Sequence, residues 1–268
     1  MDEYENRWAL PDWHSTLLWC KARNSQAIRT IIDILGEDAD EKEAVIAESS
    51  YHEVLRSITD EKLCAGISVK VTQLGYPHDK DGCMERSLSI AKDAAARRIS
   101  FEIDMEGRGM VDFALEAVAA CASENYPVTV ALQAYLDRTV EDLARVVEHG
   151  AEVRAVKGAY SGDVADFQEI QMRFKALVER LLETGSAFCI GTHDPELIEW
   201  ATEAASETSD RIEFSLLKGL SDQTKLEFVK HGWKVSEYVP FGKDKAAYED
   251  RRRMYLRHLE EMGRQPAP

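Results

Sequence analysis

The sequence predicts an α/β fold, a single-domain (β/α)8 barrel of the TIM type, and three observations support this prediction. Short apolar, β-branched runs recur at intervals of about 25 to 35 residues, which is typical of buried strands. Charged stretches with helical spacing separate them, as in a parallel sheet covered by helices. No Gly-x-Gly-x-x-Gly pattern follows the first run, and no Pro-rich or Ser-rich linker divides the chain. Eight such units therefore fit a closed barrel better than an open dinucleotide-binding sheet.

The expected elements follow one another in strict alternation. The runs expected to form strands are residues 30–35, 67–71, 100–103, 128–132, 152–156, 187–190, 212–216 and 234–238. Between them, helical spacing is clearest over residues 88–97, 110–123, 140–148, 166–183, 195–206 and 222–230. A final helix is expected to open after the Pro-Phe-Gly turn that ends at residue 242. This order places one helix after each strand, as a barrel requires.

Helix punctuation agrees with this division. Asp194-Pro195 supplies an acidic N-cap followed by proline in the first turn, and Ser221-Asp222 is expected to begin a helix in the same way. Gly150, Gly185 and Gly232 each lie between a helical stretch and a strand, where a glycine commonly ends the helix.

Two parts of the chain differ in character. Residues 1–28 form an N-terminal arm that precedes the first strand, and residues 29–268 form the barrel together with its C-terminal helix. The arm carries Trp8, Trp13 and Trp19. Two interpretations stay open for these rings, namely packing against the barrel or docking on a membrane surface.

Composition excludes several partners. Of the 268 residues, 44% are hydrophobic and 31% charged, which is ordinary for a globular protein, but the net charge is −16. This field repels nucleic-acid phosphates and anionic lipid surfaces, so we expect no nucleic-acid partner and at most a peripheral membrane contact. No apolar run is long enough to span a bilayer. The five cysteines are odd in number, widely spaced and without a Cys-x-x-Cys pair, which favours free thiols in the cytoplasm.

Polar side chains gather where the expected strands end. The carboxyl ends of the strands in a barrel share one rim, and catalytic residues lie there. Burying such groups without a ligand or partner is costly, so a polar-ligand site is expected at this rim. The residues at these ends are Glu37, Lys70, Asp104, Gln133, Arg154, Lys157, Thr192, His193, Asp194, Leu217 and Tyr238, of which all but Leu217 are polar.

The final helix adds two guanidinium groups to this rim. Tyr248, Arg251 and Arg252 lie at i, i+3 and i+4, so they share one helical face. Paired arginines suit a planar carboxylate, although a solvated charged helix is the alternative for this stretch alone. Together with Lys70, Arg154 and Lys157, these two arginines predict a cationic pocket that selects a small anionic ligand, with Asp104 placed to neutralise Lys70.

A metal site is not expected. Among seven histidines only His193 falls at a strand end, and neither His-x-His nor His-Glu-x-x-His occurs. No Ser–His or Cys–His pair is apparent from spacing.

These residues resemble the proline dehydrogenase family, a flavin-bearing (β/α)8 barrel. Nine segments occur in family order, and the spacing of Tyr238 and Tyr248 resembles the monofunctional bacterial type. By comparison with that type, the helices before the first strand are largely missing. The segments are residues 32–37, 68–75, 103–106, 132–136, 153–160, 192–194, 213–219, 238–242 and 248–252.

The resemblance implies a role for each matched position. Flavin, either FAD or alternatively FMN, is held at Gln133, Arg154, Lys157, Gly158, Ala159, Thr192, His193 and Asp194. Cations that grip a substrate carboxylate match Lys70, Arg251 and Arg252, and Glu37 matches the acid that pairs with the first arginine as a gate. The wall around the substrate ring matches Asp104, Tyr160, Leu217, Tyr238 and Tyr248. The catalytic set is then Lys70, Asp104, Arg154, Tyr238, Arg251 and Arg252.

The resemblance also implies an activity, oxidation of L-proline to pyrroline-5-carboxylate by hydride transfer to flavin N5, the first step of proline catabolism. A quinone or another acceptor then takes the electrons, so the expected location is the cytoplasm, with a peripheral contact at the inner membrane where a membrane quinone is the acceptor. Three alternatives stay open: a flavin enzyme for hydroxyproline or another cyclic or N-alkyl amino acid, a non-enzymatic amino-acid-binding barrel, and a lyase with Lys70 or Lys157 as Schiff base.

The chain also departs from the family pattern. Ser215 stands where the family usually has glutamine, and Lys218 stands where it usually has tyrosine. These changes concern the outer pocket and the lid more than the carboxylate clamp.

Overall fold

A computed structural model describes residues 6–261 and 263–268. Its eight strands are all parallel and close into a barrel in chain order, with β1 paired to both β2 and β8. The predicted (β/α)8 fold is therefore confirmed. The strands are β1 (Arg29–Ile34), β2 (Ala65–Val69), β3 (Ser100–Ile103), β4 (Val128–Gln133), β5 (Glu152–Val156), β6 (Phe188–Gly191), β7 (Ile212–Leu217) and β8 (Lys234–Phe241).

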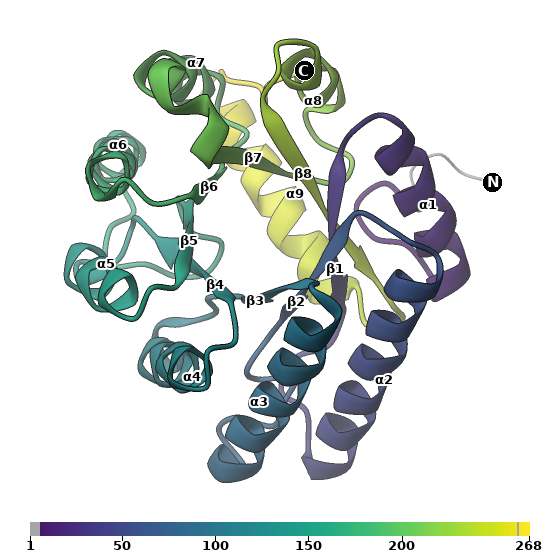
Figure 1. Cartoon of the computed structure of the whole chain (residues 1–268). Helices are drawn as coiled ribbons and strands as arrows, with labels where there is room; N and C mark the ends of the chain where they lie inside the picture. Colours follow the sequence, from purple (N-terminus) through teal and green to yellow (C-terminus); the bar gives the residue numbers. More distant parts are fainter. Residues whose placement is uncertain (1–5, 262) are drawn as a thin grey trace.

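Helices surround this barrel, and one of them lies apart from the ring (Figure 1). The helices before and between the strands are α1 (Trp13–Ser25), α2 (Glu41–Asp60), α3 (Lys80–Arg97), α4 (Val111–Ser123), α5 (Thr139–Glu148), α6 (Phe167–Thr184), α7 (Pro195–Ala204) and α8 (Asp222–Lys230). Helix α9 (Ala246–Glu261), yellow in Figure 1, projects across the middle of the ring. Short 3-10 turns occur at Arg108–Met110 and Ser206–Arg211.

Strand boundaries lie close to those expected, and β8 differs most. The sequence predicts a turn at its Pro-containing end, but Val239, Pro240 and Phe241 continue the pairing with β1. The Pro240 carbonyl accepts a hydrogen bond from Leu10 N at 2.9 Å, so the proline gives the strand an acceptor on the side of the N-terminal arm. The strand is longer than the local sequence suggests because its neighbours fix it.

The helix caps agree with the sequence at α7 and differ at α8. The Asp194 carboxylate accepts from Glu196 N at 3.2 Å and caps α7 as expected. Gly150 and Gly232, with φ of 70° and 83°, follow α5 and α8. Ser221 does not cap α8: its backbone is left-handed (φ 55°) and its hydroxyl contacts His193 instead. The sequence signal for a helix start was correct, but a tertiary contact takes the serine side chain.

Helix α1 is attached to the outside of β8 through a buried cluster of charges. Glu237 of β8 is fully buried and accepts from Trp19 Nε1 at 2.6 Å. Arg23 of α1 lies 2.9 Å from this carboxylate, and Lys225 of α8 lies 2.6 Å from it. A buried carboxylate needs such partners, because a charge without them would be expensive to desolvate. The cluster therefore joins the arm, β8 and α8.

None of the helices in the described ranges is both long enough and apolar enough to cross a bilayer. All five cysteines are free thiols, four of them buried. Across those same ranges, His, Cys, Asp and Glu side chains form no group of three that could hold a metal ion.

The apolar core lies between the barrel and its helices. Phe214 points outward from β7 and is fully buried against Phe228 of α8 and Trp233, with ring centroids 4.3 and 5.2 Å away. Aromatic contacts of this kind add to the free energy gained by burying apolar surface.

We expect Phe214→Ala to lower the free energy of unfolding by about 3–5 kcal/mol, because it removes a buried ring and leaves a cavity. Denaturant titration followed by circular dichroism measures the change. The control is Met172→Ala on α6, where the methionine is 64% exposed and the loss should stay below about 0.5 kcal/mol. Equal losses in the two variants would contradict the assignment of Phe214 to the core.

Candidate active site

A cavity opens at the carboxyl ends of the strands, beneath helix α9. It contains about 960 Å³ of empty space when its open mouth is included, which is the size range of small-molecule sites. Every strand except β1 contributes to its lining, directly or through the loop that follows. The lining residues are Lys70, Asp104, Met105, Ala131, Gln133, Arg154, Val156, Lys157, Gly158, Ala159, Tyr160, Gly191, Thr192, His193, Ser215, Leu217, Tyr238, Tyr248, Arg251, Arg252 and Tyr255.

The structure brings the side chains expected at the rim together around this cavity. Two of them, Glu37 and Asp194, do not line it. Glu37 lies behind Arg251 and Asp194 lies behind Lys157, each as the carboxylate partner of that cation. The roles assigned to the individual residues stay predictions.

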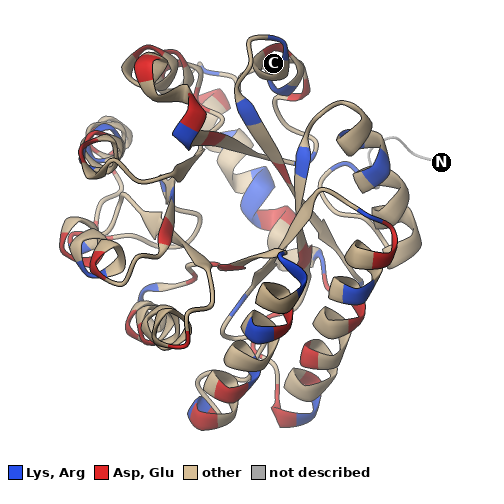
Figure 2. Ribbon diagram, viewed as in Figure 1, with Lys and Arg blue, Asp and Glu red and all other residues tan. Residues whose placement is uncertain are grey.

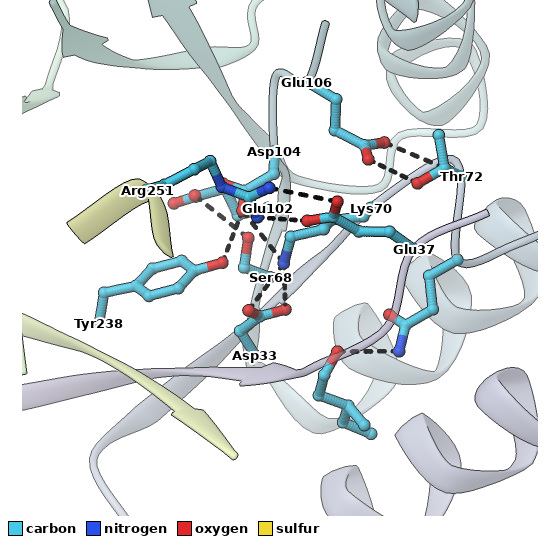
Figure 3. A network of polar contacts seen from close by, with 12 residues as sticks. Asp33, Glu37, Ser68, Lys70, Thr72, Glu102, Asp104, Glu106, Tyr238 and Arg251 are labelled. Atoms are coloured by element: carbon cyan, nitrogen blue, oxygen red, sulfur yellow. Dashed lines mark hydrogen bonds and ion pairs between the residues drawn. The ribbon is translucent and has the colours of Figure 1, made fainter. Parts of the chain in front are cut away.

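Lys70 is held by two carboxylates (Figure 3). Its Nζ donates to both oxygens of Asp33 at 2.7 Å, and Asp104 Oδ2 lies 3.7 Å away. Burial disfavours the ammonium, but the two carboxylates outweigh it and raise the pKa of Lys70 above its ordinary value. The expected contact between Lys70 and Asp104 is therefore present, but it is longer than the contact between Lys70 and Asp33. Asp33 was not among the predicted site residues, and its only sign in the sequence is a lone charge inside an apolar strand.

Arg154 joins a second pair of carboxylates. Its Nη2 contacts Glu102, and it lies 2.6 Å from Asp104. The Tyr238 hydroxyl donates to the other Asp104 oxygen at 2.5 Å, as Figure 3 shows. Burial raises the pKa of Glu102 to about 7, whereas for Asp104 the cations Arg154 and Lys70 outweigh burial and lower the pKa. Asp104 is thus the anion on which Lys70, Arg154 and Tyr238 converge.

Arg251 is paired across the mouth of the cavity. Its guanidinium makes two hydrogen bonds to Glu37, one of them at 3.2 Å, and its centre lies 4.7 Å from the Tyr160 ring. The Tyr160 hydroxyl reaches the same carboxylate at 3.4 Å. The geometry matches the pairing expected between Glu37 and the first arginine.

Arg252 has no carboxylate within 4 Å among the residues that the structure describes, unlike the other cations of the cavity. Its guanidinium lies 4.5 Å from the Tyr248 ring centroid, and its Nε is buried without a hydrogen-bond partner. The hydroxyl groups of Tyr248 and Tyr255 are likewise buried and unpartnered. This face of α9 therefore offers polar atoms that only a ligand or water can satisfy.

Tyr255 was not anticipated from the sequence. It lies seven residues after Tyr248, four after Arg251 and three after Arg252, so it shares their helical face. That spacing was the available signal, and extending the pattern by one more turn would have found it.

On the opposite side of the cavity, several expected ligand groups already have partners. Gln133 donates from Nε2 to Glu106 O at 3.0 Å and accepts from the Tyr135 hydroxyl at 2.8 Å. His193 Nε2 accepts from Leu217 N at 3.0 Å, so Nδ1 carries the proton and donates to Ser221 Oγ at 2.8 Å. Burial lowers the pKa of His193 well below its usual value and keeps the ring neutral.

The contact between His193 and Ser221 brings a serine and a histidine together, although their sequence spacing gave no sign of it. Because Nδ1 is the donor, the ring cannot accept the hydroxyl proton, and Ser221 does not line the cavity. The pair fixes the backbone of Leu217 and does not form a nucleophile with its base.

Lys157 faces the cavity from the end of β5. It lies 3.2 Å from Asp194 and 4.5 Å from the ring centroid of Phe167. Burial lowers the pKa of Lys157 despite the carboxylate. Asp194 also accepts from Gln171 at 2.8 Å, so this carboxylate is fixed before any ligand arrives.

Glu106 is a buried carboxylate beside this network. It is 3% exposed and accepts from Thr72 N at 3.0 Å and from the Thr72 hydroxyl at 2.5 Å, as Figure 3 shows. No cation within the described ranges lies within 4 Å of it. Burial raises the pKa of Glu106 to about 7, although the bonds from Thr72 oppose the shift.

Taken together, the arrangement can bind a small zwitterion. Most cations of the cavity are already paired with carboxylates. Arg252 Nε and the hydroxyl groups of Tyr248 and Tyr255, all on α9, still lack hydrogen-bond partners among the described residues. The described lining holds no Ser, Cys or Thr activated by a basic histidine, so covalent acyl transfer has no support from the geometry.

Comparison with known proteins gives one family. The family model for proline dehydrogenase matches residues 19–263. The chain is 31% identical over 251 residues to proline dehydrogenase 2 of Bacillus subtilis (strain 168), covering 90% of this chain and 82% of that one. It is 28% identical over 240 residues to proline dehydrogenase 1 of the same strain, with 87% and 80% covered.

Solved structures share the fold. Proline utilization A from Bdellovibrio bacteriovorus, inactivated by N-propargylglycine, has a TM-score of 0.83 at 20% identity, and 93% of this chain is covered. Proline utilization A from Corynebacterium freiburgense has a TM-score of 0.76 at 18% identity, with 95% covered. The present chain spans only 32% and 30% of those two chains.

We expect Glu106→Gln to stabilise the protein more at pH 8 than at pH 5. The raised pKa means that the folded state binds the proton more tightly than the unfolded chain does. The wild-type protein therefore loses stability as pH rises from about 4.5 to about 7, and an always-neutral glutamine does not. The gain at pH 8 should be on the order of 2 kcal/mol, measured by denaturant titration at both pH values.

Glu203→Gln, at an exposed position of α7, is the matched control and should show no such pH-dependent difference. A Glu106→Gln variant whose stability relative to wild type is the same at pH 5 and pH 8 would contradict the raised pKa.

Proposed function

We propose that this chain, which belongs to the proline dehydrogenase family on its monofunctional bacterial side, oxidises L-proline to pyrroline-5-carboxylate with a bound flavin as hydride acceptor. The curated relatives are named for proline dehydrogenation, and the family is flavin-dependent. The flavin of this chain, the hydride step and the product belong to the proposal. FAD is the cofactor we favour, with FMN as the alternative.

The residues present fit a flavin. Four buried polar atoms of the cavity lining have no partner, namely Arg154 Nε, Arg252 Nε and the hydroxyls of Tyr248 and Tyr255. Arg154, Lys157, Gly158, Ala159 and Thr192 supply donors along the β5 and β6 side of the cavity, opposite α9. His193 would offer only its ring face and its backbone, because both ring nitrogens are engaged. A bound flavin would accept the hydride, which the side chains themselves cannot do.

The proposal depends most on one observation, the unpaired charge of Arg252 among the residues that the structure describes. This arginine is the lining cation whose charge no carboxylate offsets within the described part of the chain, so an incoming carboxylate finds an available fork there. Arg251 can join it only by sharing its guanidinium with Glu37. Lys70 completes a clamp of three cations on the acid group of proline.

The opposite end of the substrate is handled by Asp104 and the tyrosines. Proline arrives as a zwitterion, and its ammonium must release a proton to the solvent before the ring carbon can give up a hydride. Asp104 is kept anionic and faces the cavity, so it stabilises the ammonium during binding. Leu217, Tyr160 and Tyr248 close the remaining sides and exclude water from the reacting carbon.

Tyr238 favours proline over hydroxyproline. Its ring is 4% exposed and its hydroxyl donates to Asp104 at 2.5 Å. The ring therefore cannot swing aside, and a hydroxyl on the substrate ring would meet it. In this proposal a quinone or another acceptor reoxidises the reduced flavin, and the protein makes a peripheral contact with the inner membrane.

The direct test is an absorption spectrum followed by an activity assay. We expect the purified protein to absorb near 450 nm, roughly where oxidised flavins absorb, and to reduce a dye when proline is added. Mass spectrometry of the released cofactor distinguishes FAD from FMN. A colourless protein that binds proline would favour the amino-acid-binding barrel, and borohydride trapping of a carbonyl substrate would favour the lysine-dependent lyase.

We expect Arg252→Met to raise KM for proline by about 10- to 100-fold, because charge-assisted hydrogen bonds to a carboxylate contribute roughly 1.5–3 kcal/mol. Arg251→Met should raise it less, since Arg251 already shares its charge with Glu37. Steady-state kinetics measures both, and the flavin absorbance should be retained in both.

Arg154→Met is the contrasting variant, because Arg154 is assigned to the flavin. It should lower flavin occupancy or shift the reduction potential of the flavin. A KM for proline that stays at the wild-type value in both Arg251→Met and Arg252→Met would refute the clamp.

A further inference from the structure

The N-terminal arm extends to the end of the barrel that holds the cavity. Packing along β8 alone would not bring the arm this far. Leu10 lies alongside the end of β8, donating to Pro240 O at 2.9 Å and accepting from Gly242 N at 3.0 Å. Residues 6–9 continue from this point toward the mouth. The arm therefore runs beside the loop that leads from β8 into α9.

The loop after β7 grips the same segment. Lys218 Nζ donates to Asn6 O at 2.6 Å and to Arg7 O at 2.9 Å, and Arg7 Nε donates to Gly219 O at 3.1 Å. Gly219 has φ of 76°, and a Cβ there would lie 2.3 Å from Arg7 O. The close approach of the two backbones thus requires a glycine. Burial lowers the pKa of Lys218 to about 8.

Between these two anchors the arm packs on the walls of the cavity. Ala9 is fully buried in a cluster with Tyr238 and Tyr248, and Trp8 and Leu217 pack against this cluster. The Trp8 ring also lies 5.7 Å from the guanidinium of Arg253 on α9. Three walls of the proposed substrate site therefore rest on the arm from behind: the ends of β7 and β8 and the first turns of α9.

We propose that residues 6–10 position the substrate-binding walls, with Trp8 and Lys218 as positioning residues that hold α9 and its arginine pair over the cavity. This inference rests on the proposed function for its kinetic part. Neither side chain lines the cavity, so both act through Leu217, Tyr238 and Tyr248. A helix that crosses the mouth needs such lateral support, because its arginines must be fixed to grip a carboxylate.

The first measurement is the kinetics of Trp8→Ala in the flavin-loaded protein. We expect KM for proline to rise about tenfold, while kcat stays roughly within twofold and flavin occupancy is unchanged. Trp8→Phe should restore the wild-type KM, because Trp8 Nε1 makes no hydrogen bond and the ring supplies the packing. Trp200→Ala on α7, which removes a half-buried tryptophan remote from the arm, is the control.

Lys218→Met tests the second anchor. It removes both hydrogen bonds to the arm, so it should raise KM as Trp8→Ala does. In the double variant, KM for proline should exceed that of the more severe single variant by no more than about twofold, because both residues act through the same segment. Fully multiplied effects would mean that the two residues act separately and would overturn the shared role.

Hydrogen exchange provides a readout that does not depend on activity. In Trp8→Ala, amides of α9 (246–261) should exchange faster, whereas those of α5 (139–148), outside the barrel and away from the arm, should not change. If wild type fails to oxidise proline but α9 loosens, the proposed function falls and the positioning role stands. If α9 exchanges as in wild type, or if KM is unchanged in an active enzyme, the positioning role is refuted.

Discussion

The compensation of buried charge inside the barrel is the constraint on which the rest of this structure depends. The interior of a (β/α)8 barrel is commonly filled by bulky apolar side chains. Here ionisable groups point inward from β1, β2, β3 and β5, and each must find a partner, because an isolated buried charge is costly. Asp33 of β1 holds Lys70 at the end of the adjacent strand β2, whereas Glu102 and Asp104 reach from β3, across β4, to Arg154 on β5. Strand register is therefore coupled to the geometry of the site above it.

Charge compensation also determines what the cavity can receive. Five cations line this cavity and five carboxylates pair with four of them, so positive and negative groups balance there although the protein carries a net charge of −16. Figure 2 shows both signs of charge spread over the outer helices, with Lys and Arg also on α9. A neutral site with separated charges suits a zwitterion better than a simple anion. The cations are Lys70, Arg154, Lys157, Arg251 and Arg252, and the carboxylates are Asp33, Glu37, Glu102, Asp104 and Asp194.

The sequence predicted the barrel and the positions around the cavity because both follow from local rules. Strand periodicity and the rule that strand ends share one rim placed Lys70, Asp104 and Arg154 correctly. What it missed depends on tertiary contacts. Asp33 and Glu102 lie within strands, where nothing local shows which cation they meet. The hydroxyl of Ser221 was assigned to a helix cap, but it bonds His193, 28 residues away in the chain.

Helix α9 and the cavity wall beneath it are held partly by residues that lie far away in the chain. Arg251 and Glu37 are separated by 214 positions, and the Tyr238–Asp104 bond spans 134. Contacts this distant in sequence form late, because a long loop must close before they contribute. During synthesis the N-terminal arm and β1 leave the ribosome well before β8 and α9. The binding pocket is accordingly among the last parts of the molecule to be assembled, because a chain that still lacks β8 and α9 has none of the residues that they contribute to it.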